Sequence, residues 1–157
     1  MHILIKVYNS CISTIDKEYP KTIKGYAFEI GEPAVKRILD RIKPGCSVNL
    51  KYVSVCRKDS QDITDEDRAK VADICSKMTY SKILITHGTD TMIETASFVA
   101  RLVKDKTIVI TGAFLPETFK NSDADFNVGL AIGALQSNTY PGVYIAIEWM
   151  RVPMVRM

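Results

Sequence analysis

The segment 86–92, with the sequence THGTDTM, brings together a glycine, three hydroxyls and a carboxylate. It lies between a short β-branched run and a stretch of helical period, which predicts a turn from a strand into a helix. Free backbone N–H groups at the start of a helix favour an anion or a developing oxyanion. The segment is therefore a candidate functional loop. The plainer alternative is that Thr89 or Asp90 only caps the helix and that His87 forms a hydrogen bond within the loop.

A second polar segment, DSQD at 59–62, follows another predicted strand. The Ser60 hydroxyl and the Gln61 amide are suited to bind a carboxylate, and Asp90 is suited to bind an ammonium group or a lysine. Taken alone, Ser60 and Gln61 are explained better by a solvated turn. In a parallel sheet, however, ligands bind beyond the carboxyl ends of the strands. We therefore expect the two segments to meet there.

The elements that must position these residues follow from periodicity. Short β-branched runs alternate with stretches of helical period, which predicts an α/β fold with three layers and a parallel sheet of the flavodoxin or Rossmann type, in strand order 2-1-3-4-5. The apolar runs 83–85 and 108–110 indicate central strands covered on both faces. The expected strands are 3–8, 48–55, 82–86, 107–111 and 142–147, and the expected helices are 32–42, 65–77, 92–103 and 125–136.

Two boundary features add detail to this outline. Thr64 and Asp67 resemble a capping box at the start of the helix 65–77. The segment 11–31 shows no clear period, and a long irregular segment in a compact domain is typical of a functional loop. We expect it to form a flap over the site.

Composition limits the class of protein. A length of 157 residues with 46% apolar and 25% charged residues predicts one folded domain and excludes wholesale disorder. The net charge, 21 − 18 = +3, is spread among mixed signs and gives no reason to expect nucleic acid as a partner. No Gly-x-Gly-x-x-Gly or phosphate-loop pattern supports a dinucleotide or flavin.

Cysteine usage and hydropathy point to the compartment. We expect reduced thiols without a disulfide or a metal, because the four cysteines lack zinc-ligand spacing. No apolar run approaches about 18 residues and no export signal is recognisable, so we expect a cytoplasmic protein that does not enter a membrane. The cysteines are Cys11, Cys46, Cys56 and Cys75.

Longer strings of sequence suggest a family. The run ILITHGTDTMIETA at 83–96 resembles, nearly residue for residue, the second signature of the bacterial-type L-asparaginase family. DSQD at 59–62 is similar to its substrate-binding Ser-Gln loop, and ITGAFLP at 110–116 is similar to its Gly-Ala-x-x-Pro strand end. NSDADFN at 121–127 resembles the helix start that follows. Residues 15–148 follow the pattern of the family's amino-terminal domain, and we expect 1–157 to be a single domain of that type.

The resemblance implies an activity and residue roles. The family hydrolyses the side-chain amide of L-asparagine, and sometimes of L-glutamine, through a nucleophile and an acyl-enzyme, without a metal or cofactor. By resemblance, Thr89 and Asp90 are catalytic, and Ser60 and Gln61 hold the amino and carboxylate groups of the substrate. Gly88 belongs to the same substrate-binding set. The family also implies that Tyr26 lies in a flap, although a tyrosine there also serves as a packing anchor, and that a second copy forms a homodimer that covers the crevice.

The start of the chain departs from the family pattern. Where the family reads Thr-Gly-Gly-Thr-Ile, residues 10–17 read SCISTIDK. If Thr14 is matched to the end of that signature, Cys11 falls on the nucleophile and residues 12–13 replace both glycines. Thr14 and Cys11 are therefore the catalytic candidates on this side. The family also pairs the Thr-Asp of its second signature with a lysine in the proton relay, and this lysine is not found, since no lysine follows Lys120. The alternative to an active amidohydrolase is thus a catalytically impaired remnant that binds the amino acid.

Overall fold

A computed structural model describes residues 3–9, 14–18, 21–22, 25–26, 29–30, 32–42, 48–56 and 58–148. Five strands form one sheet in which every neighbouring pair is parallel. They are β1 (Ile3–Asn9), β6 (Val48–Ser54), β7 (Lys82–Thr86), β8 (Thr107–Thr111) and β9 (Gly142–Ile145). Their spatial order is β6-β1-β7-β8-β9, so that the five strands, counted along the chain, run 2-1-3-4-5.

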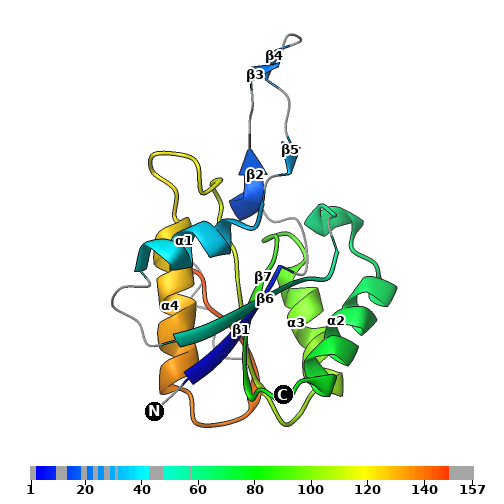
Figure 1. Cartoon of the computed structure of the whole chain (residues 1–157). Coiled ribbons are helices and arrows are strands. Elements are labelled where there is room, and N and C mark those ends of the chain that lie inside the picture. Colours follow the sequence, from blue (N-terminus) through cyan, green and yellow to red (C-terminus); the bar gives the residue numbers. More distant parts are fainter. Residues whose placement is uncertain are drawn as a thin grey trace.

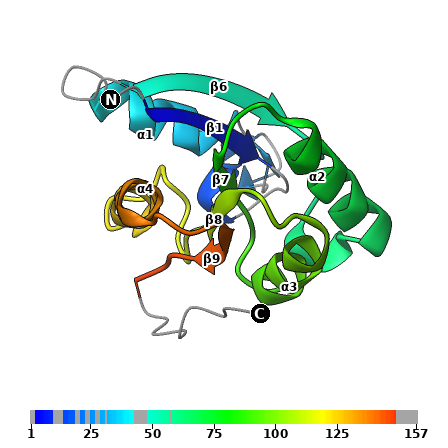
Figure 2. The same ribbon diagram turned by 90° about the horizontal axis from the view of Figure 1, so that it is seen from below.

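Helices cover both faces of this sheet (Figure 2). The helices α1 (Ala34–Ile42) and α4 (Ala124–Ser137) lie on one face, and α2 (Asp65–Lys77) and α3 (Met92–Leu102) lie on the other. Alternation along the central strands fills both layers. Leu84 of β7 joins the apolar cluster under α1 and α4, whereas its neighbours Ile83 and Ile85 join the cluster under α2 and α3. The predicted three-layer α/β class is confirmed.

The observed ends of these strands and helices lie within two residues of the predicted ones. The predicted capping box at α2 is also confirmed. Thr64 Oγ1 accepts a hydrogen bond from the Asp67 N–H at 3.3 Å, and Asp67 Oδ2 accepts one from the Thr64 N–H at 3.2 Å. Short-range side-chain chemistry therefore sets where this helix begins.

The segment 11–31 differs from the expected irregular loop. Its described part contains the 3₁₀ turn η1 (Thr14–Asp16) and the short strands β2 (Lys17–Glu18), β3 (Lys21–Thr22), β4 (Gly25–Tyr26) and β5 (Glu29–Ile30). β2 pairs with β5 and β3 with β4, both antiparallel and with the same hairpin register. Figure 1 shows this hairpin standing away from the sheet. The prediction of a structureless segment was wrong because strands of two residues are too short to show an alternating pattern.

Candidate active site

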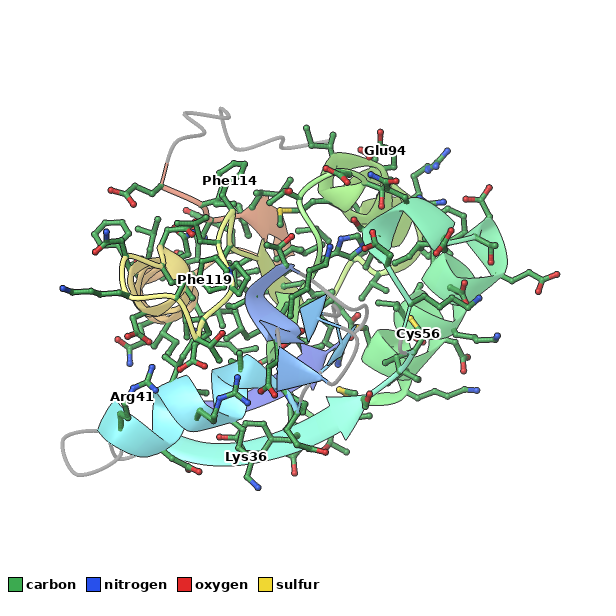
Figure 3. The ribbon with its side chains drawn as sticks, turned by 90° about the horizontal axis from the view of Figure 1, so that it is seen from above. Lys36, Arg41, Cys56, Glu94, Phe114 and Phe119 are labelled. Atoms are coloured by element: carbon green, nitrogen blue, oxygen red, sulfur yellow. The ribbon has the colours of Figure 1, made fainter. Side chains whose placement is uncertain are left out.

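Three loops meet where the strands end, at the edge of the sheet that Figure 3 views from above. After β6 the chain forms the 3₁₀ turn η3 (Ser60–Asp62), and after β7 the residues 87–91 lead into α3. The third loop, 112–123, connects β8 to α4 and carries Phe114 and Phe119, which are labelled in Figure 3. The parallel direction of the strands is what brings these loops to one edge.

The loops after β6 and β7 are joined by side chains. Gln61 Nε2 donates a hydrogen bond to Asp90 Oδ2 at 2.8 Å, and both residues are exposed. Thr91 Oγ1 donates to the Ser60 carbonyl oxygen at 2.7 Å. The structure therefore brings together the two segments that the sequence placed at this edge. An amide and a carboxylate now stand next to each other at the surface, where a small amino acid could reach both.

Two glycines allow the loops to approach so closely. A Cβ atom at Gly88 would lie 2.4 Å from both Cβ and Oγ of Ser60, and a Cβ atom at Gly112 would lie 2.3 Å from the His87 carbonyl oxygen. Neither distance is compatible with a larger side chain unless the backbone moves. Gly88 thus fixes how near Ser60 lies to the β7 loop, and Gly112 does the same for the loop after β8.

Asp59 organises the turn that carries Ser60 and Gln61. Its Oδ1 accepts hydrogen bonds from the Gln61 N–H at 3.2 Å and from Ser60 Oγ at 3.4 Å, and its Oδ2 lies 3.1 Å from Lys17 Nζ. Burial opposes ionisation of this carboxyl, but the Gln61 N–H and the Lys17 ammonium outweigh it and lower the pKa of Asp59. Asp59 therefore stays ionised at neutral pH and ties β2 to η3.

The other predicted site residues lie in different parts of the chain. Thr89 is half-buried in the turn before α3. Thr14 is half-buried at the start of η1. It precedes Lys17, which contacts Asp59, by three residues. Cys11 lies outside the described residues. Tyr26 belongs to β4, for which the structure describes the backbone, on the outlying hairpin of Figure 1. The catalytic or binding roles of all four stay predictions.

His87 follows the plainer of the two sequence interpretations. Its side chain is fully buried, and Nδ1 lies 2.7 Å from the Gly88 carbonyl oxygen. Because a carbonyl can only accept, Nδ1 carries the proton and donates it. Burial lowers the pKa of His87 and keeps the ring neutral. Among the described residues Nε2 has no hydrogen-bond partner.

Sequence reasoning missed the side chains that hold the loop after β8. Asp123 stands at the N-cap of α4 but makes no capping bond, and its carboxylate accepts instead from the Phe114 and Leu115 N–H groups at 3.0–3.1 Å. Asn127 is fully buried, donates from Nδ2 to the Gly112 carbonyl at 3.0 Å and accepts at Oδ1 from the Glu148 N–H at 2.8 Å. The signals in the sequence were the polar cluster at a helix start and the resemblance of NSDADFN at 121–127 to the helix start of a known family, and neither indicated these contacts.

The comparison with protein families decides the identity of this fold. The family model described as "Asparaginase, N-terminal" matches residues 17–150, which include η3, the β7 loop and the loop after β8. The chain belongs to the asparaginase family. The predicted family and amino-terminal domain type are therefore confirmed.

Among its asparaginase relatives, "Probable L-asparaginase periplasmic" of Haemophilus influenzae is 31% identical over 128 residues, which cover 78% of this chain and 37% of the relative. "L-asparaginase 2" of Escherichia coli is 33% identical over 111 residues, covering 67% of this chain and 31% of the relative. The chain thus spans less than half the length of these curated relatives.

Solved structures of asparaginases share the fold. The probable cytoplasmic L-asparaginase from Campylobacter jejuni superposes with a TM-score of 0.78 at 25% identity, over 94% of this chain and 46% of that one. The thermostable L-asparaginase from Thermococcus kodakarensis gives a TM-score of 0.74 at 27% identity, over 93% and 44%. The described part of the present chain therefore has the shape of about half of a solved asparaginase.

The described residues include neither a metal site nor a membrane-spanning helix. No group of three or more His, Cys, Asp or Glu side chains in this part of the asparaginase chain is arranged to hold a metal ion. No helix within the described ranges is long and apolar enough to cross a membrane.

Proposed function

We propose that this chain binds L-asparagine at the carboxyl edge of its sheet and takes part in hydrolysis of the side-chain amide. The observation that carries the proposal is the contact of Gln61 with Asp90, at 2.8 Å between Nε2 and Oδ2, in a chain of the asparaginase family. Relatives that are named L-asparaginases support it. Action on L-glutamine belongs to the same proposal, since two relatives are named glutaminase-asparaginase.

Binding follows from the chemistry of the two loops. The free N–H of the Gln61 amide donates to the carboxylate of the ligand, as does the Ser60 hydroxyl once it turns from its long bond to Asp59, and the exposed Asp90 accepts from the ammonium group of the ligand. The bond between Gln61 and Asp90 holds the donor for one ligand group beside the acceptor for the other. This arrangement favours an α-amino acid over a simple amide, because a simple amide satisfies neither group.

Hydrolysis needs a nucleophile next to this pocket. A hydroxyl of Thr89 or Thr14, or the Cys11 thiol, attacks the amide carbon while a base takes its proton. The proton then passes to the departing nitrogen, and ammonia leaves an acyl-enzyme that water hydrolyses to L-aspartate. Free N–H groups at the start of α3 are suited to stabilise the developing oxyanion.

The test is ammonia release from L-asparagine and L-glutamine by the purified chain, with calorimetric titration of L-aspartate on the same sample. Cys11→Ala, Thr14→Val and Thr89→Val are compared with Cys56→Ala and with Thr79→Val, which changes an exposed residue before β7. We expect turnover in the wild type, and its loss in one of the first three variants identifies the nucleophile.

Two other outcomes are informative. Binding of L-aspartate without turnover would favour the amino-acid-binding remnant, for which the altered residues 10–17 are the motivating observation. The absence of both binding and turnover would refute the proposed function.

The homodimer and the cytoplasmic location predicted from the sequence belong to the same proposal. Exposed apolar side chains on the β8 loop and the first half of α4 support a covering neighbour: Phe114, Leu115, Phe119, Phe126 and Leu130. Light scattering that gives the mass of one 17.6 kDa chain would contradict the dimer.

A further inference from the structure

Thr91 occupies the N-cap position of α3 without acting as a cap. A threonine at this position normally accepts a hydrogen bond from a backbone N–H of the first helical turn. Thr64 does so at the start of α2, but Thr91, with φ −120° and ψ 22°, makes no side-chain capping bond. Thr91 is of a residue type that could stabilise its own helix, but its hydroxyl does not bond the first turn of α3.

The hydroxyl of Thr91 is directed to the neighbouring loop. It donates to the Ser60 carbonyl oxygen at 2.7 Å. Ser60 is only 4% exposed, and its side chain lies against the backbone of Gly88, where a Cβ atom would come within 2.4 Å. Ser60 is thus held from two directions by the loop after β7, through its carbonyl and through its side chain.

We propose that Thr91 is a positioning residue for the ligand-binding pair Ser60 and Gln61, an inference that rests on the proposed function. Its hydroxyl fixes the main chain of Ser60, so that the Ser60 hydroxyl and the Gln61 amide point to the ligand without having to be ordered by it. Thr64 caps α2, whereas Thr91 leaves α3 without a side-chain cap and bonds Ser60 instead. Such a loss of local stability is typical of a functional site.

A positioning role for Thr91 affects ligand binding and not the chemical step. Thr91 touches Ser60, which holds the ligand, and is not itself a nucleophile candidate. Loss of its hydroxyl should therefore loosen the ligand and leave the chemical step nearly unchanged. A threonine that merely stabilises its turn would lower the unfolding midpoint and leave the affinity as it is.

The first experiment compares Thr91→Val, which keeps the shape and removes the hydroxyl, with Thr91→Ser, which keeps the hydroxyl. For Thr91→Val we expect KM for L-asparagine and Kd for L-aspartate to rise about threefold to tenfold, the range for one lost hydrogen bond, with kcat within about twofold. Thr91→Ser should behave as the wild type. Thr64→Val is the matched control, since it removes a capping hydroxyl, and we expect a lower unfolding midpoint with unchanged KM.

The inference is overturned if Thr91→Val leaves KM and Kd unchanged, or if Thr91→Ser fails to restore them. A fall in kcat at constant KM would overturn it as well, because the hydroxyl would then serve the chemical step.

A second measurement does not depend on activity. Amide hydrogen exchange of residues 59–63 reports the order of the loop, in which Ser60 O also accepts from the Ile63 N–H at 3.4 Å. Exchange should quicken in Thr91→Val and not in Thr91→Ser, and equal rates in all three proteins would refute the role of Thr91. If the wild type neither hydrolyses L-asparagine nor binds L-aspartate, the proposed function fails, while exchange still decides whether Thr91 holds Ser60.

Discussion

Position 88 shows how one residue can set the geometry of a binding site. Gly88 lies in the turn after β7, and Ser60 stands so near that a methyl group in its place would lie 2.4 Å from the Ser60 Cβ and Oγ atoms. Because the Thr91 hydroxyl holds the Ser60 carbonyl at 2.7 Å, Ser60 has little freedom to withdraw. Any side chain at position 88 must therefore move one loop away from the other.

We expect Gly88→Ala to weaken binding of L-aspartate by at least about tenfold, since a displacement of the loops breaks hydrogen bonds to the ligand. Isothermal titration measures this loss. The matched control is Gly133→Ala in α4, where an added Cβ meets nothing within 4 Å. That change should leave the affinity intact and stabilise the helix by up to about 1 kcal/mol. Equal affinities in both variants would show that Ser60 does not bind the ligand.

Some of this residue-scale detail follows from the sequence, and some does not. That Ser60 and Gln61 approach Asp90 is predictable, because both segments follow strands of one parallel sheet. That Thr91 turns from its helix toward Ser60 is not, since the capping rule predicts the opposite. Nor does the sequence reveal that Asn127 joins Gly112 to Glu148, because that bridge depends on how α4 packs against two loops. Sequence patterns describe local preference, and these contacts override it.

At the scale of elements, the start of α2 was the most predictable. The capping box and the acidic first turn are both local, so Thr64 and Asp67 could be assigned without a tertiary structure. The hairpin β2–β5 was missed for the converse reason, because its pairing joins short polar stretches that have no period of their own. One tertiary contact of α2 could not be predicted from the sequence either. Lys58 Nζ lies 2.7 Å from the buried Asp67 Oδ2.

The contact with Lys58 makes the stability of α2 depend on pH. The Lys58 ammonium, assisted by Thr64 and opposed by burial, lowers the pKa of Asp67 to about 2. The pKa of an aspartate in the unfolded chain is about 3.9, so the folded state binds fewer protons than the unfolded state as the pH falls through that value. The stabilisation by this carboxylate is complete above about pH 5 and is lost as the pH falls toward 2.

We therefore expect Asp67→Asn to lower the free energy of unfolding by about 1–3 kcal/mol at pH 7, the range for hydrogen bonds to a charged group. The difference from the wild type should shrink steadily between about pH 5 and pH 2, because the carboxylate of the unfolded chain takes up a proton in this range while the native carboxylate stays ionised. Urea unfolding at several pH values measures it. Asp73→Asn is the control, because the exposed Asp73 side chain forms a surface ion pair with Lys77 of the same helix, at 2.8 Å. A difference that stayed constant with pH would contradict the ionic origin.

At the scale of the whole molecule, one sheet serves two cores. Side chains of β7 and β8 alternate between the cluster under α1 and α4 and the cluster under α2 and α3. The continuous apolar runs 83–85 and 108–110 record this arrangement in the sequence, because a strand covered on both faces has no polar side. Neither layer of helices has a sheet of its own. We therefore propose that residues 1–157 fold as a single domain, as their number suggests.

A single domain of this kind should unfold in one step, whichever face is weakened. Leu84 and Ile85 are adjacent in β7, both fully buried, and point to opposite clusters. Leu84→Ala and Ile85→Ala should each lower the free energy of unfolding by about 2–5 kcal/mol. Leu102→Ala is the control, because that leucine is 59% exposed at the end of α3, and it should change stability by no more than about 0.5 kcal/mol.

The two probes to compare are far-UV circular dichroism, which reports helices and strands, and near-UV circular dichroism, which reports packed aromatic side chains. Coincident transitions in the wild type and in both core variants are expected, since β7 belongs to both layers and cannot lose one while keeping the other. If Leu84→Ala instead produced a first step that removed only part of the helical signal, the layer of α1 and α4 would unfold separately. Both layers of helices would then pack against the same sheet and yet unfold as separate cooperative units.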